Sequence, residues 1–261
     1  MKEYFKKIYE TRYFWFHLAK MELRNKFRRS KLGILWTFIS PLCLTLIMSF
    51  VFATVFNVDI VTYAPYILAG LVFWDLVNNS FVSGGFTIIS SEAYIRQFCH
   101  PITIYTLKSA IVYTITFLIA LISLAVWILI ISPENLIIAL LSLPLTTVLF
   151  FLLAWAGTTI AAYTNTKYRD YPQMMPLIMQ TLWYLSPVFF QEDMFAQNAV
   201  LHNWFNANPI THMLFLLRKP FLEGIFPSFE NYIITIVTIL IFGIMAIVIS
   251  KKNSKNIIFY I

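Results

Sequence analysis

The chain has 261 residues, of which 59% are hydrophobic and only 12% are charged, about half of the roughly 25% typical of a soluble domain. So few charged side chains cannot cover a soluble fold of this length, and the apolar content with only seven glycines excludes collagen and disorder. The two cysteines cannot build a disulfide framework. We therefore expect one all-α, polytopic membrane domain over residues 1–261.

Residues 1–31 are predicted to form an amphipathic interfacial helix before the first span. Apolar residues recur at spacings of three and four, and basic residues recur every four: Phe16, Ala19, Leu23 and Phe27; Lys20, Arg24 and Arg28. One interpretation is a positively charged anchor in the lipid headgroups. The other is that Arg24, Arg28 and Arg29 bind phosphates of an anionic lipid-linked substrate, because guanidinium groups bind phosphate bidentately.

Runs without charged residues predict six membrane spans, because a charge at mid-bilayer is costly and a helix needs about 20 residues to cross. The predicted spans are residues 32–58, 60–89, 105–133, 135–163, 171–191 and 231–250. The second contains one charge, Asp75. Residues 192–230 hold three prolines and many polar residues, and are predicted to be an outer re-entrant segment buried against protein.

The distribution of Lys and Arg predicts that both termini are cytoplasmic. With the N-terminus inside, 17 of the 19 basic residues lie in cytoplasmic segments. The net charge of +7 is therefore a topology signal and does not indicate nucleic-acid binding. Arg218 and Lys219 are then the only outer cations. We interpret them as an exposed pair with Glu223, the alternative being a guide for an acidic glycan.

The loop over residues 90–104 predicts a short helix from Glu92 to Phe98. Ser90 or Ser91 can cap it, and Pro101 should end it. Residues suited to docking a partner gather on this helix: Glu92, Tyr94, Ile95, Arg96 and Phe98. The alternative is an ordinary loop helix lying on the membrane.

Polar and aromatic residues within the spans are candidates for contact with a sugar. Asp75 with Asn78 forms a polar patch in the second span, either for sugar hydroxyl groups or for packing between helices. Aromatic rings at plausible outer depths can stack on sugar rings, although membrane interfaces use the same residues: Phe52, Phe56, Tyr66, Tyr184 and Phe189.

The sequence lacks a phosphate-binding loop and any His or Cys metal motif, so we expect no catalytic residue and no metal site. An integral membrane glycosyltransferase would need clustered acidic residues, and a secondary transporter would be expected to show inverted repeats; neither is found. Energy for transport must come from another subunit or from an ion gradient.

Three stretches together give a resemblance to a known family: residues 22–56 around "SKLGILW", residues 66–105, and "YLSPVFFQEDMF" from Tyr184 followed by "NPITHMLFLLRKPFLEG". The chain resembles the membrane subunit of type 2 ABC exporters for lipid-linked polysaccharide, such as O-antigen permeases. The resemblance implies a homodimer in the bacterial inner membrane, with two ATPase subunits that bind ATP and Mg. It implies that each ATPase binds one cytoplasmic coupling helix. Teichoic acid and capsular polysaccharide remain alternative substrates.

Overall fold

The structure is a computed structural model that describes residues 6, 8–28, 31–56, 58–97, 100–191, 199–253 and 257. Every regular element among these residues is helical. The main helices are α2 (Arg12–Arg28), α3 (Trp36–Phe56), α4 (Ile60–Phe81), α5 (Glu92–Gln97), α6 (Thr103–Ile131), α7 (Asn135–Lys167), α8 (Tyr171–Leu185), α9 (Ala199–Ala207), α10 (Pro209–Arg218) and α11 (Phe229–Asn253). Short 3₁₀ turns precede α3 and link α4 to α5, and a π-helical turn follows α10.

Five helices in the described part of the chain are long and apolar enough to cross a membrane: α3, α4, α6, α7 and α11. This confirms the membrane class, and the five helices are candidates for five of the predicted crossings. Helices α6 and α7, with 29 and 33 residues, are about 43 and 50 Å long, against a hydrocarbon thickness of about 30 Å.

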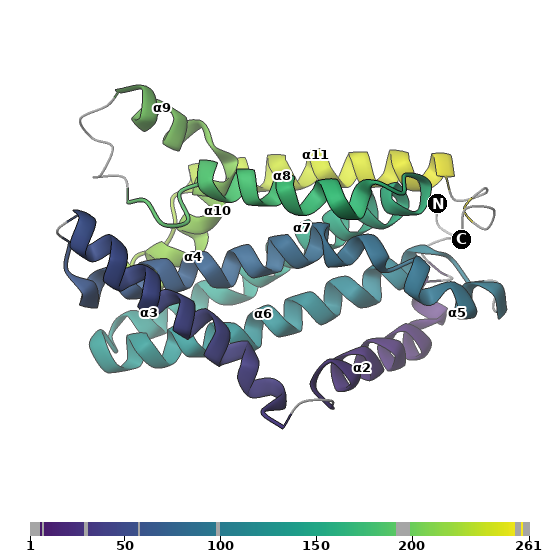
Figure 1. Cartoon of the computed structure of the whole chain (residues 1–261), viewed down its shortest axis with the longest axis horizontal. Coiled ribbons are helices and arrows are strands. Elements are labelled where there is room, and N and C mark those ends of the chain that lie inside the picture. The colour runs from purple at the N-terminus through teal and green to yellow at the C-terminus, as the bar shows by residue number, and fades with distance from the viewer. Residues whose placement is uncertain are drawn as a thin grey trace.

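The remaining predicted span, residues 171–191, is a shorter helix than expected. Helix α8 ends at Leu185 after 15 residues, or about 22 Å. Ser186 has extended backbone, and the residue before a proline is disfavoured in the helical conformation, so Pro187 explains the early end. Even so, α8 runs along the bundle from the end that carries α5 towards the end that carries α9 (Figure 1). We call these the α5 end and the α9 end.

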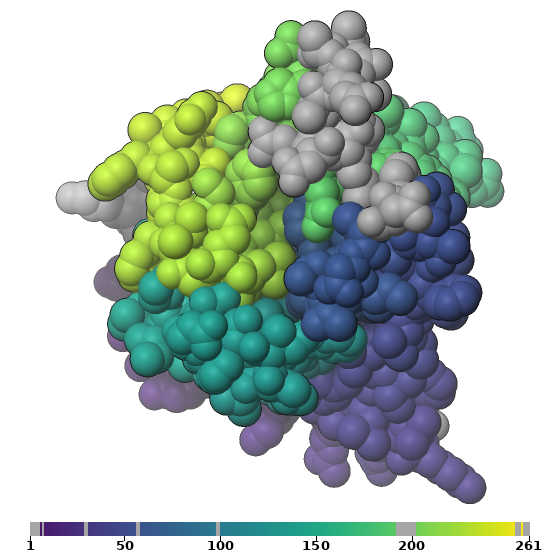
Figure 2. Space-filling model, turned by 90° about the vertical axis from the view of Figure 1, so that its left-hand side faces the viewer, coloured from purple at the N-terminus to yellow at the C-terminus, as the bar shows by residue number. Residues whose placement is uncertain are grey.

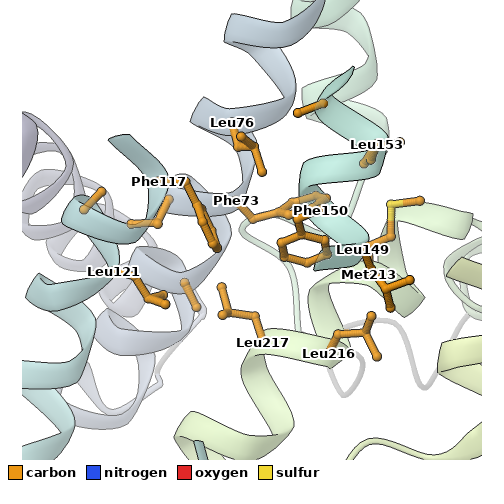
Figure 3. Close-up of a cluster of buried hydrophobic side chains, with 14 of the residues drawn as sticks. Phe73, Leu76, Phe117, Leu121, Leu149, Phe150, Leu153, Met213, Leu216 and Leu217 are labelled. Atoms are coloured by element: carbon orange, nitrogen blue, oxygen red, sulfur yellow. The ribbon is translucent and has the colours of Figure 1, made fainter. Parts of the chain in front are cut away.

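The core is centred on α4, which packs against α3, α6 and α7. Phe150 of α7 contacts Phe73 of α4 and Phe117 of α6, with ring centroids 4.9 and 5.7 Å apart. Helix α10 contributes Leu216 and Leu217 to the same cluster (Figure 3). Helix α10, within the segment predicted to be re-entrant, therefore supplies part of the core.

Helix α2 packs along α6. Leu18 and Ala19 are buried, and Glu22 forms an ion pair of 2.8 Å with Lys108 of α6. A helix is thus present where one was expected. Of its predicted apolar stripe, Ala19 is buried and Leu23 and Phe27 are half-buried, whereas Phe16 is exposed.

Helix α10 is buried against α4, α7 and α11. Figure 2 shows the α9 end of the molecule. There the teal connection between α6 and α7 lies beside the yellow-green start of α11 and beside the blue residues where α3 leads into α4.

Candidate functional site: a polar cleft beside α8

A polar cleft of about 600 Å³ lies between α2, α3, α4, α6 and α8. Helix α4 contributes three of its eight polar lining residues, more than any other helix. The polar lining residues are Lys26, Thr37, Ser40, Asp75, Asn78, Asn79, Thr116 and Gln180. Lipid tails cannot form hydrogen bonds with these polar groups. A cleft of this composition between membrane helices therefore suits a polar ligand.

The predicted polar patch is at the centre of this cleft. Asp75 and Asn78 both line it, and the Asp75 side chain is exposed. The amide of Asn79 donates to the backbone carbonyl of Asp75 at 2.8 Å, and the Asn79 side chain also hydrogen-bonds with the Asp75 carboxyl group. The carboxylate and the Asn78 amide can also bond with hydroxyl groups of a ligand in the cleft.

Three tryptophan side chains contribute to the apolar part of the lining. Trp36 of α3, Trp74 of α4 and Trp183 of α8 all contribute. An aromatic ring presents an apolar face and, in Trp, one N–H donor. Flat aromatic faces beside amide and carboxylate groups suit a sugar, whose ring has an apolar face and a hydroxylated rim.

The basic residues predicted to bind phosphate lie elsewhere. Arg24 and Arg28 are exposed on α2 and do not line the cleft, and Arg29 is outside the described residues. Lys26 is the basic side chain that lines it within the described part of the chain. Its Nζ lies 3.5 Å from Thr116 Oγ1.

The predicted aromatic residues gather towards the α9 end instead of lining the cleft. We define the aromatic cluster as Phe52, Trp183, Phe189 and Phe190. Phe52 stacks on Phe189 with centroids 5.8 Å apart, and Phe189 meets Trp183 edge-on at 4.7 Å. Because Trp183 also lines the cleft, the cluster adjoins the cleft through this ring. Tyr184 is exposed beside Trp183, and the side chain of Phe56 is outside the described residues.

The backbone that follows α8 is held by side chains from α4 and α10. Arg218 donates to the carbonyls of Pro187 and Val188, each at 2.7 Å. The hydroxyl groups of Tyr63 and Tyr66 donate to the next two carbonyls, those of Phe189 and Phe190, at 2.6 and 2.7 Å. We call these three side chains and four carbonyl groups the carbonyl latch.

The carbonyl latch corrects the interpretation of Arg218 as an exposed partner of Glu223. The side chain is 2% exposed, and no ion pair among the described residues involves it. Its guanidinium lies 3.5 Å from the centroid of the Tyr66 ring. The sequence contained a signal that Arg218 is buried, because most of its neighbours in the run from Met213 to Phe221 are of the apolar types that pack in a core.

The short helix α5 turns part of its predicted docking face inward. Ile95 is buried, and Tyr94 packs edge-on against Phe14 with centroids 6.3 Å apart. Glu92 and Arg96 form an ion pair of 2.8 Å on the exposed side. Phe98 is outside the described residues. The surface that α5 presents is therefore formed by its polar residues.

The described residues contain no group of three His, Cys, Asp or Glu side chains that could hold a metal ion. The site consists of hydrogen-bonding groups and aromatic faces, which can bind and guide a ligand.

Comparison with known proteins agrees with a transport role. Residues 13–222 match the ABC-2 type transporter family. Two proteins of Klebsiella pneumoniae named O-antigen export system permease protein RfbA are 21% and 22% identical to this chain, over 90% and 79% of both chains. A protein of the same name from Myxococcus xanthus is 22% identical over 86% of both.

Proposed function

Since the chain belongs to the ABC-2 type transporter family, we propose that it exports a lipid-linked polysaccharide of the O-antigen type across the bacterial inner membrane. The chain is a permease without catalytic residues, and its family implies an ATPase partner. In the proposal, two copies of the chain assemble with two ATPase subunits, which bind ATP and Mg. The observation that carries the substrate class is the polar cleft, with carboxylate, amide and tryptophan groups between membrane helices.

We propose that the α5 end is cytoplasmic and that α8 with the turn after it completes a sixth crossing. The ends of α2 and α11 near that end support this topology (Figure 1), because α2 begins and α11 ends there. The basic residues before α3 also support it. Helix α5 is the proposed coupling helix, and its Glu92 and Arg96 are the side chains available to the ATPase.

The test is export by the purified complex in proteoliposomes, followed with a lipid-linked glycan that carries a fluorescent label. We expect ATP-dependent movement of the glycan and faster ATP hydrolysis in its presence. Gln180→Leu, which changes a cleft residue of α8, should reduce export several-fold. Thr181→Val is the matched control, because Thr181 is the next residue, is exposed and bonds only within its helix in the contacts found. Equal export by both variants, or export without ATP, would contradict the proposal.

A further inference from the structure

The carbonyl latch holds irregular backbone among helices that include candidate membrane spans. Its partners on α4, Tyr63 and Tyr66, are three and six residues inside the helix start at Ile60, which is about 5–9 Å along the axis. Carbonyl groups at such a depth need donors from protein, because the hydrocarbon supplies none.

Each carbonyl from Leu185 to Phe190 has a donor, and that of Ser186 accepts from the backbone N–H of Val188 at 2.7 Å. The last carbonyl of the helix, that of Leu185, accepts from Trp204 Nε1 at 3.0 Å and from the Asn208 amide at 3.3 Å. The four carbonyls after Ser186 are bound by the carbonyl latch. The turn is therefore fixed in one position by groups from three other elements.

Gly70 allows the carbonyl latch to form. A Cβ at this position would lie 2.6 Å from the Val188 carbonyl oxygen and 2.7 Å from Arg218 Nη2. Both distances are below any normal contact, so a side chain here would push the turn or the guanidinium away. The planar guanidinium donates to two successive carbonyls, and its Nη2 also donates to the Tyr66 carbonyl at 3.2 Å. A lysine side chain has a single nitrogen and cannot reproduce this arrangement.

We infer that Arg218 is a positioning residue, which holds Phe189 and Phe190 in the aromatic cluster and so keeps the α9 end of the polar cleft sealed. Phe189 is the link, because its carbonyl is held by Tyr63 while its ring packs between Phe52 and Trp183. The outward placement of the α9 end and the identity of what passes the seal rest on the proposed function, whereas the contacts of the latch and the cluster do not.

The experiment measures access to the cleft from outside. A reporter thiol is introduced as Asn78→Cys after both native cysteines are replaced by serine, and a membrane-impermeant maleimide is added to right-side-out vesicles. Denatured protein gives the reference for complete labelling. We expect slow labelling of the reporter protein, and labelling about tenfold faster or more with Arg218→Gln, since hydrogen bonds from a charged donor are lost.

Three further variants separate positioning from folding. Gly70→Ala should also speed labelling although it removes no polar group, and Arg218→Lys should not restore the slow rate. Lys219→Gln is the matched control and should label slowly, because this neighbouring cation lies over Phe215 and is not in the latch. If Arg218→Gln does not accumulate as a folded complex, Tyr66→Phe decides, since it deletes one hydroxyl group and keeps the ring.

Unchanged labelling in folded Arg218→Gln and Gly70→Ala, or in Tyr66→Phe where it decides, would overturn the inference. Failure of the proposed function would give a different result. The parent protein would export no glycan, while the variants of the carbonyl latch would still change the labelling rate.

Discussion

The ion pair between Glu22 and Lys108 should fix α2 to the bundle, and its contribution can be worked out from its surroundings. The two charged groups are 2.8 Å apart, and the side chains are 33% and 11% exposed. Exposed pairs contribute about 0.2–1 kcal/mol, whereas removing one partner of a buried pair costs about 3–5 kcal/mol. Glu22→Gln leaves the more buried ammonium without its partner, so we expect a loss of about 2 kcal/mol in the free energy of unfolding, between these limits.

The reverse deletion should be milder. Lys108→Met leaves a carboxylate that water can reach, and we expect a loss of about 1 kcal/mol. The double variant should then lose about 1 kcal/mol as well, so that the coupling in a double-mutant cycle is about 2 kcal/mol, or roughly 30-fold in the equilibrium. Reversible unfolding of the purified protein in mixed micelles would measure all four states. Additive losses, with a coupling near zero, would refute the reasoning.

Other predictions concern α5, the turn after α10 and the basic face of α2. Ile95→Ala should lower the free energy of unfolding by about 2–3 kcal/mol, because Ile95 is buried. Arg96→Ala should lower it by less than about 1 kcal/mol, since it breaks only an exposed ion pair, and should reduce co-purification with the ATPase; the opposite pattern would contradict the docking role. Gly224→Ala should cost at least about 1–2 kcal/mol, measured as a lower unfolding midpoint, since the glycine has φ +65° and an added Cβ would overlap an asparagine. Arg24→Gln with Arg28→Gln should reduce export without loss of membrane insertion, and unchanged export would remove these exposed residues from the substrate path.

The membrane helices were predictable because charged residues flank the apolar runs that form them. The run starting at 135 predicts a span to 163, and α7 covers Asn135–Lys167. The same rule placed the end of α8 too late. A run without charged residues indicates that a segment is soluble in lipid, but it does not indicate that the backbone is helical throughout. Pro187 was the local signal that the helix stops, and it carried more information than the length of the run.

The cleft was partly predictable from the same reasoning. Asp75 and Asn78 stood out because polar groups inside a span need a partner or a cavity, and both line the cleft. Lys26 was not selected, although the spacing of Ala19, Glu22, Leu23 and Lys26 places two charged residues on the face that packs against α6. The charged residues on the face of α2 that packs against α6 were therefore a better guide to the ion pair and the cleft than the exposed basic stripe was.

Arg218 could not be placed from sequence because its partners are not acidic. The search for a salt bridge led to Glu223, which is close in sequence, whereas the groups that stabilise the cation are carbonyl dipoles about 30 residues away. Those carbonyls are free to accept because α8 ends at Leu185, so that no N–H group of a further helical turn binds them. An arginine flanked by core residues, downstream of a helix that a proline ends early, is thus better read as a donor for that helix end than as a surface charge.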